Sequence, residues 1–236
     1  MNAPHFAVSV LTTAYLPPVE YFFAIAHSDR VLIEQCENYQ KQSWRNRCRI
    51  LSAAGPEDLS IPIVKEERRS RPIRDIRIDY GSPWLQHHIR AFAAAYNHSA
   101  FYDDYADDLL PIFERKPAFL FDLNLALLEK LLELLDLHTP LSLTEHYESV
   151  LPGSIGHLFD GRQRIQPKYK GESLLAEYGR EQAYYQVFVN EPPDQVGGDG
   201  RGLRHSRLDR ESHFIPNLSV LDLLSAEGPD AGRYLR

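Results

Sequence analysis

Short apolar runs, separated by turn residues, dominate the first 64 positions of the chain. Residues 6–11 predict a first strand, residues 19–26 a helix that follows Pro17 and Pro18, and residues 30–35 a second strand. Further strands are expected at residues 48–51 and 59–64. A strand, a short helix and a second strand in close succession favour parallel pairing. The pattern therefore predicts an α/β fold with an N-terminal β-loop-α-β unit and a mostly parallel, Rossmann-like sheet.

From about residue 80 the apolar spacing becomes that of amphipathic helices. A helix with Ser82 as its N-cap is expected to continue to residue 96, and a second helix covers residues 102–113. A leucine-rich helix follows Pro117 and completes a helical half of the fold. The other expected elements are a half-exposed strand over 74–80, a short strand within 141–148, an ordered loop over 151–171, a β-rich run over 184–189, and a closing helix through Leu218, Leu221 and Leu224 with Asn217 as its N-cap.

Residues 191–213 differ from the rest because they are rich in Gly, Pro and charged residues and almost without apolar ones. This composition predicts a flexible surface insertion. A length of 236 residues with 43% hydrophobic content fits one domain over 1–236 that carries this insertion.

Charge and cysteine content exclude several classes of protein. A formal net charge of −7 argues against non-specific nucleic-acid binding, although it leaves room for a local basic site for phosphates. Cys36 and Cys48 are too few for a disulfide framework and lack zinc-site spacing. Free thiols and an N-terminus unlike a signal peptide lead us to expect a cytoplasmic protein. The most apolar stretch, residues 119–137, contains six charged or amide side chains, so no membrane span is expected.

The densest polar and aromatic segment is residues 34–49, which follows the second expected strand, where α/β sheets usually bind ligands. Arg45, Arg47 and Arg49 alternate, so in an extended segment they would share one face and could bind a diphosphate or a carboxylate. Tyr39 and Trp44 would supply stacking surface. The alternative is an edge strand whose arginines are solvated or paired with carboxylates such as Glu34 and Glu37.

Candidates for acid–base chemistry are fewer. His87 and His88 are adjacent on an expected helix, about 100° apart, so they cannot form the i, i+4 metal pair of a metalloprotease. Either one could act as a general base, or could be a surface or capping residue. Cys36 and Cys48 are expected to be buried and inert. The sequence has no P-loop, dinucleotide fingerprint, nucleophile elbow or metal-binding loop, so no metal is expected and the cofactor is left open.

Several segments together are typical of one family. The chain resembles the bacterial WbqC-like family in YLPPVEYF from Tyr15, ENYQKQSWRNRCRI from Glu37, Trp84, Tyr96, YDDYADD from Tyr102, FLFD from Phe119, YYQVF from Tyr184 and FIPNLS from Phe214. This family is associated with O-antigen and other surface-polysaccharide (lipopolysaccharide) gene clusters. The resemblance implies a transferase that adds an acyl or glycyl group to a nucleotide-linked amino sugar. The motif positions to test are Tyr39, Lys41, Trp44, Arg45, Asn46 and Arg47.

The N-terminal strand, YLPPVEY turn, helix and VLI strand also resemble the opening of the nucleotidylyltransferase and pantothenate-synthetase superfamily. That superfamily places a His-x-Gly-His motif at this turn, whereas this chain has no histidine pair or glycine there. The resemblance therefore concerns the fold and not ATP chemistry.

Two hypotheses of function follow. In the first, an amide-forming transferase holds a nucleotide-linked amino sugar, or another phosphorylated small molecule, on Arg45, Arg47 and Arg49. His87, His88 or Glu20 would be its base, Asn46 or an arginine would stabilise the oxyanion, and Tyr15 and Trp84 would line the ligand site. In the second, the protein binds a ligand or partner of the same pathway without catalysis. A histidine or carboxylate within hydrogen-bonding reach of the arginines would favour the transferase.

Overall fold

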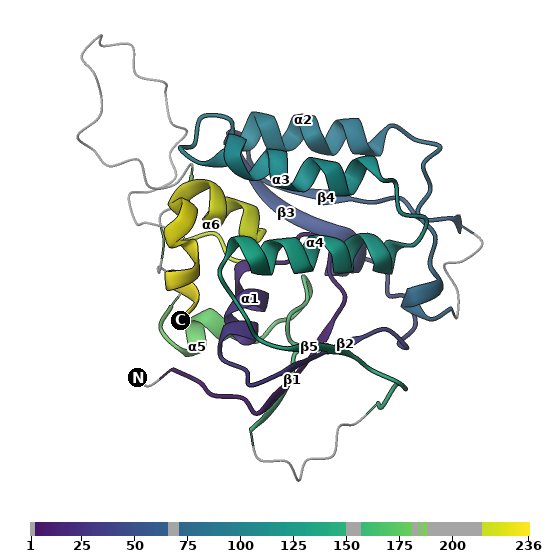
Figure 1. The fold of residues 1–236 in the computed structure, drawn as a ribbon, viewed down its shortest axis with the longest axis vertical. Coiled ribbons are helices and arrows are strands. Elements are labelled where there is room, and N and C mark those ends of the chain that lie inside the picture. Colours follow the sequence, from purple (N-terminus) through teal and green to yellow (C-terminus); the bar gives the residue numbers. More distant parts are fainter. Residues whose placement is uncertain (1–2, 66–70, 150–156, 181–183, 185, 188–213) are drawn as a thin grey trace.

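The computed structural model describes residues 3–65, 71–149, 157–180, 184, 186–187 and 214–236. A four-stranded parallel sheet in the order β5-β2-β1-β6 occupies one side of the molecule (Figure 1). β1 (Val8–Thr12), α1 (Val19–Ala26) and β2 (Val31–Glu34) form the expected β-loop-α-β unit. β5 (Leu141–Leu143) pairs with β2, and β6 (Leu158–Asp160) pairs with β1. The predicted α/β class with a mostly parallel sheet is confirmed.

The apolar runs of β1 and β2 form the inner strands of the sheet, where β1 is buried on both faces. All five residues of β1 are buried, and the neighbouring α1 is buried from Val19 to Ile25. Parallel strands enclosed in this way read as continuous apolar segments rather than as alternating ones. The register aligns Val10 with Leu32 and with Asp160, so β1, β2 and β6 end at the same edge.

A second layer contains the helical half and a separate antiparallel hairpin. The hairpin is formed by β3 (Arg47–Ser52) and β4 (Gly55–Ser60), and it packs beneath α2 (Trp84–Tyr96). α3 (Tyr102–Glu114) lies beside α2, and α4 (Leu120–Leu134) crosses between these helices and the sheet (Figure 1). Near the C-terminus are α5 (Leu174–Glu177), α6 (Val220–Glu227) and the 3-10 segment η5 (Gly228–Leu235).

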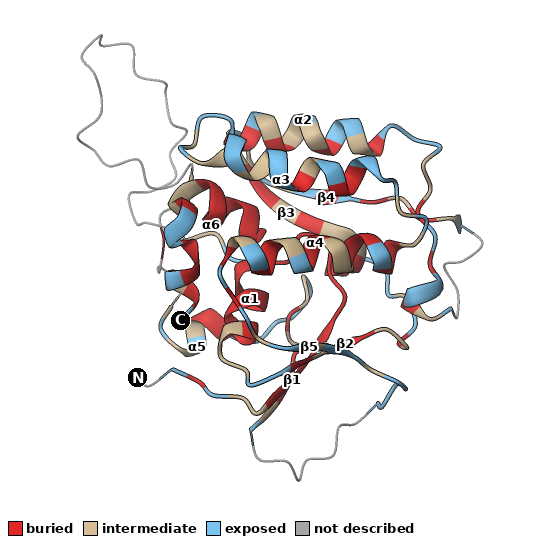
Figure 2. Cartoon of the chain, in the orientation of Figure 1, coloured by how far each residue is buried: buried red, intermediate tan, exposed pale blue. Residues whose placement is uncertain are grey.

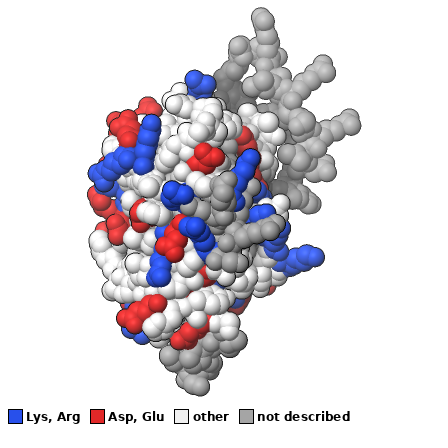
Figure 3. Space-filling model, turned by 90° about the vertical axis from the view of Figure 1, so that its right-hand side faces the viewer, with Lys and Arg blue, Asp and Glu red and all other residues white. Residues whose placement is uncertain are grey.

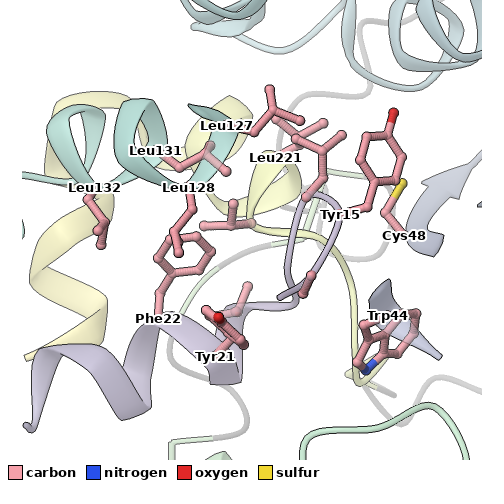
Figure 4. Packing of buried hydrophobic residues seen from close by; sticks show 14 of the residues in the cluster. Tyr15, Tyr21, Phe22, Trp44, Cys48, Leu127, Leu128, Leu131, Leu132 and Leu221 are labelled. Carbon is pink, nitrogen blue, oxygen red and sulfur yellow. The ribbon is translucent and has the colours of Figure 1, made fainter. Parts of the chain in front are cut away.

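The core lies where α1, α4 and α6 meet. Leu120, Leu123, Leu127 and Leu131 form a fully buried stripe at helical spacing on α4. Figure 4 shows this helix packing its leucines toward Phe22 of α1, with Leu221 of α6 beside them. Buried residues follow the inner faces of these helices and the sheet, while the outer faces of α2 and α3 are exposed (Figure 2).

Several expected elements differ in the structure. Residues 74–80 do not form a strand. The 3-10 turn η3 (Ile73–Asp75) is followed by single bridges from Ile78 to Ile63 and from Arg77 to Phe119. Ile76 and Ile78 are buried as their alternation predicted, but without a continuous partner strand they cannot extend a sheet.

The expected loop over 151–171 contains the strand β6, which the sequence pattern missed. Helix caps were also predicted at the wrong residues. α2 follows Pro83 without a side-chain cap, so Ser82 does not cap it. Ser219, rather than Asn217, caps α6 and accepts a hydrogen bond from the Leu221 backbone.

Two expectations fall wholly or partly outside the described residues. The insertion over 191–213 is one, and most of the β-rich run over 184–189 is the other. Over the described ranges, no helix combines the length and the apolar content needed to cross a membrane.

Candidate functional site

The carboxyl edge of the parallel sheet carries a dense set of buried polar side chains. From β1 the chain continues to β2 and β5 on one side and returns to β6 on the other, so the strand order reverses between β1 and β6. In open α/β sheets, ligands bind outside the carboxyl ends of the strands at such a reversal. Thr12, Glu34 and Asp160 are the last residues of β1, β2 and β6. The edge is therefore the first place to look for a site.

Glu34 is the fully buried centre of this edge. Its Oε1 accepts hydrogen bonds from the backbone N–H of Cys36 at 2.7 Å, the backbone N–H of Glu37 at 3.2 Å and the Thr144 hydroxyl at 2.8 Å. Its Oε2 accepts from Nη1 of Arg162 at 3.3 Å. These donors compensate the loss of water around the carboxylate and fix its position.

Arg162 connects β6 to Glu34. It donates to both carboxylate oxygens of Asp160, at 2.9 and 2.8 Å, and from Nη1 to the Glu148 carbonyl at 2.8 Å. Its guanidinium also lies over the Tyr147 ring, 5.3 Å from the ring centre. With most of its donors used within the protein, Arg162 holds the two sides of the reversal together.

A second buried ion pair joins Glu37 and Arg45. Nε and Nη2 of Arg45 donate to the two carboxylate oxygens of Glu37, at 2.8 and 2.5 Å, and both side chains are almost completely buried. Burial raises the pKa of Glu37 although the Arg45 guanidinium opposes the rise. Nη1 of Arg45 and Nε1 of the adjacent Trp44 are buried and lack a hydrogen-bond partner among the described residues. Buried donors without a partner are unusual, and those of Arg45 and Trp44 are candidates to bind an oxygen atom of a water molecule or ligand.

Side chains of the helices α4 and α1 hold the neighbourhood of this pair in place. Nδ2 of Asn124 donates to the Arg45 carbonyl at 2.7 Å and to the Thr13 hydroxyl at 3.2 Å. The hydroxyl of Tyr21 donates to the Thr12 carbonyl at 2.8 Å. The loop after β1 is therefore connected to the segment that carries Arg45.

Basic residues lie around the buried pair. Residues 71–74 run beside 35–39, because the Ile73 backbone donates to the Glu37 carbonyl. Arg74 extends from this segment toward the sulfur of Cys36, at 3.7 Å. Lys168 contacts the side chain of Gln42, next to the exposed Lys41. Lys41, Arg74 and Lys168 thus belong to three segments that contain or contact residues 35–42.

The three predicted arginines do not share one face. Arg45 belongs to a 3-10 turn (Trp44–Asn46) and points to Glu37, so the alternative of pairing with that carboxylate holds for it. Arg47 and Arg49 do lie together on β3, where both pair with Asp58 across the hairpin, at 3.3 and 2.7 Å. Because the strand begins only at Arg47, the alternation that placed Arg45 with them does not apply. Lys and Arg side chains lie among Asp and Glu on the face shown in Figure 3.

The predicted aromatic residues mainly belong to the core. Trp44 and Tyr15 are buried, and Figure 4 shows Tyr15 next to Cys48. Arg49 lies over the Trp44 ring at 5.7 Å. Trp84 is also buried and packs against His88. Cys48 is buried, as expected, whereas Cys36 is partly exposed.

The candidate bases are separated from one another. His87 is exposed on α2. His88 is buried, and its Nδ1 lies 2.9 Å from the Tyr15 hydroxyl. Burial lowers the pKa of His88 to about 4, with the nearby His87 adding to the effect and the Ser60 backbone opposing it. A neutral, hydrogen-bonded histidine in this position stabilises the packing of α2 on the core.

Glu20 and Asn46 have their own partners. Oε2 of Glu20 accepts from the Leu174 backbone at 3.2 Å, and burial raises the pKa of Glu20 to about 7 against the influence of that bond and of Arg164. Glu20 therefore faces α5 and not the arginines. Asn46 donates to the Ile61 carbonyl at 2.7 Å and accepts from the Tyr39 hydroxyl at 3.1 Å.

The sequence pattern did not single out Asp160, Arg162 or Asn124, and it named Glu34 and Glu37 only as ion-pair partners. Glu34 was recognisable as a charged residue at the end of an apolar strand. Asp160 and Arg162 were hidden because β6 has only three residues and lies between Gly- and Pro-rich segments. In the described part of the chain, no group of three or more His, Cys, Asp or Glu side chains is placed to hold a metal ion.

A protein-family model and a known protein both match most of the chain. The model of the WbqC-like protein family matches residues 13–176, which include the residues of the carboxyl edge named above except Thr12. The uncharacterized protein Rv1507c of Mycobacterium tuberculosis is 30% identical over 247 residues, which cover 97% of this chain and 98% of that protein. No solved structure matches. The chain belongs to the WbqC-like protein family. The resembling segments from Tyr184 and Phe214 lie beyond the matched range.

Proposed function

We propose that this protein is a transferase that forms an amide on the amino group of a nucleotide-linked sugar, in surface-polysaccharide biosynthesis. The observation that carries the proposal is the buried Glu37–Arg45 pair at the carboxyl edge, with an unused guanidinium N–H. The pair supplies the carboxylate that the transferase hypothesis requires next to an arginine, and the same pairing is also that of a structural ion pair, so the activity test decides between the two.

In this reaction the sugar amine attacks the carbonyl carbon of an activated acyl or glycyl donor. A C–N bond forms, the bond to the donor's leaving group breaks, and the amine proton moves to Glu37 before it reaches the leaving group. Burial shifts the pKa of Glu37 upward, toward neutral pH. A general base is most effective when its pKa lies near the pH at which the enzyme works. Nη1 of Arg45 would stabilise the oxyanion, a contribution of about 2.7–4 kcal/mol for one donor.

The phosphates of the substrate would lie on the basic residues around this pair. Lys41, Arg74 and Lys168 come from three separate segments that border the edge. In the sequence-based hypothesis Arg47 and Arg49 were to bind the phosphates. We assign that role to Lys41, Arg74 and Lys168 instead, because Arg47 and Arg49 both pair with the carboxylate of Asp58.

The test is turnover of UDP- and dTDP-linked amino sugars with activated acyl and glycyl donors, followed by mass spectrometry of the sugar product. Glu37→Gln should still bind the sugar nucleotide but lose turnover by about 100-fold or more, as expected for loss of a general base. Asp58→Asn, which removes the carboxylate from the exposed hairpin pair, is the matched control and should keep turnover. Equal turnover of Glu37→Gln and wild type would contradict the proposed base.

The alternative is a binding protein of the same pathway. It is favoured by the saturation of Glu34 and Arg162 with internal partners. Tight binding of a sugar nucleotide without product formation from any activated donor would support this alternative.

A further inference from the structure

Two exposed apolar side chains lie on or just after β5, the edge strand of the parallel sheet (Figure 1). Among the described residues, the large hydrophobic side chains that are exposed are Leu143, Tyr147 and Tyr169. Leu143 ends β5 and is aligned with Ile33 of β2, so it lies at the carboxyl edge. Tyr147 follows shortly after it and is 46% exposed. An exposed aromatic ring at the edge where α/β sheets bind ligands is a candidate to contact one.

The ring of Tyr147 is held against a buried arginine. The Arg162 guanidinium lies 5.3 Å from the centre of the ring, and its Nη1 donates to the carbonyl of the next residue, Glu148, at 2.8 Å. Arg162 is only 3% exposed and is fixed by its bonds to Asp160 and Glu34. A cation over an aromatic face is attracted by the quadrupole of the ring. One face of the Tyr147 ring is therefore covered, and its exposed area belongs to the rest of the ring.

A fixed aromatic ring that is open to solvent is suited to stack a planar group. The entropy lost on binding is smaller because Arg162 already restricts the tyrosine side chain. Nucleobases stack on aromatic side chains whatever their identity, because every base has a π-face. Glu145 and Glu148, on either side of Tyr147, are exposed and acidic, so an uncharged base fits this position better than a phosphate does.

A basic residue lies close to the segment that carries Tyr147. Sγ of Cys36 donates to the carbonyl of Glu145, two residues before Tyr147, at 3.3 Å. Nη1 of Arg74 lies 3.7 Å from the same sulfur. Arg74 is exposed and is one of the basic residues proposed to bind the phosphates. An aromatic ring and a guanidinium joined by these two contacts match a ligand that carries a base at one end and phosphates at the other.

We infer that Tyr147 is the platform on which the base of the nucleotide-linked sugar stacks, while the phosphates extend toward Arg74. The inference rests on the proposed function for the identity of the ligand, and it adds the residue that recognises the base. Because stacking tolerates every base, the platform selects nucleotides over plain sugar phosphates rather than one base over another.

The test is calorimetric titration of the full chain with UMP and with ribose 5-phosphate, which has the same sugar and phosphate without a base. Wild type should bind UMP about tenfold more tightly, as expected for one stacked base. Tyr147→Leu should lose this preference and keep its affinity for ribose 5-phosphate, whereas Tyr147→Phe, which retains the ring, should keep the preference. Tyr169→Leu, the same change at a tyrosine that is 44% exposed, is the matched control and should bind both probes like wild type.

Turnover measurements separate this inference from the proposed function. The platform is overturned if wild type shows no preference for UMP, or if Tyr147→Leu retains the wild-type preference. Loss of the preference in Tyr147→Leu, together with no turnover by wild type, would support the platform and refute the transferase. Turnover by wild type, with the same KM for the sugar nucleotide in Tyr147→Leu, would support the transferase and overturn the platform.

Discussion

Single charged residues in this protein differ sharply in how much they contribute to stability. Arg45 is fully buried and pairs with Glu37, whereas Arg49 pairs with Asp58 and keeps 27% of its side chain exposed. Removal of one partner from a buried pair leaves an uncompensated charge, but removal from an exposed pair leaves a charge that water can solvate. The two arginines, four positions apart, therefore allow a direct comparison.

Arg45→Met should lower the free energy of unfolding by about 3–5 kcal/mol, because Glu37 then remains buried without its counter-ion. Arg49→Met should change it by about 1 kcal/mol or less. Urea denaturation of both variants at pH 7 measures the difference. Similar losses of unfolding free energy in the two variants would contradict the burial of the Arg45–Glu37 pair.

Asp222, on α6, gives a prediction about pH. It is fully buried, and burial raises its pKa to about 7, while the Tyr184 hydroxyl and the Val187 backbone oppose the rise. A carboxyl group of this kind binds its proton more tightly in the folded chain than in the unfolded one. The free energy of unfolding should therefore fall as pH rises from about 4 to about 7, and Asp222 contributes up to about 1.4 kcal/mol per pH unit.

Asp222→Asn should remove this contribution, so the variant should lose less stability than wild type between pH 5 and pH 8. Denaturation at several pH values tests the difference. The variant must be compared with wild type because two other buried groups also make stability depend on pH. Glu20, with its raised pKa, lowers stability as pH rises, and His88, with its lowered pKa, increases it. Asp107→Asn, on an exposed position of α3, should follow the wild-type pH dependence. An unchanged slope in Asp222→Asn would contradict the assignment.

Among the secondary-structure elements, periodicity predicted those with long apolar patterns. Helix α1 has the bounds expected, and α2 and α3 begin and end within one residue of them. Strand β6 was missed because its three residues become a strand only by pairing with β1, which a local pattern cannot show. At residues 74–80 the alternating pattern predicted a strand that did not form. The isoleucines are buried, but this segment makes only isolated β-bridges.

Gly161 shows how closely β6 packs on β1. A Cβ atom at this position would lie 2.5 Å from Cδ2 of Leu11 and 2.9 Å from the Phe159 ring. Gly161→Ala should therefore destabilise the protein by about 1–3 kcal/mol through overpacking. Gly81→Ala, where the nearest atom is the flexible carboxylate of the partly exposed Asp79 at 3.0 Å, should have a smaller effect in thermal denaturation. Equal effects would show that β6 is not packed as described.

For the whole molecule, the candidate site depends on segments that are distant in sequence. Glu34 and Arg45 belong to residues 34–49, and Thr144 and Arg162 belong to two further segments, so three segments meet only when the sheet forms. The sequence indicated one of them, residues 34–49, because its polar and aromatic density exceeds what a fold needs. It could not place Arg162, since an ion pair across 128 positions leaves no local signal.

The central claim is that the carboxyl edge of the sheet, and not the arginine pair on the hairpin, binds the phosphates of a nucleotide-linked amino sugar. It is tested most directly by thermal-shift titration of UDP- and dTDP-linked amino sugars with Lys41→Ala, Lys168→Ala and Arg47→Ala, which each remove one positive charge. Wild type should be stabilised by about 2.7 kcal/mol at a ligand concentration 100 times the dissociation constant.

The account predicts that Lys41→Ala and Lys168→Ala each weaken binding about tenfold, as expected for loss of one charged hydrogen bond, while Arg47→Ala binds like wild type. Loss of binding in Arg47→Ala with both lysine variants unaffected, or no stabilisation of wild type by any sugar nucleotide, would contradict it.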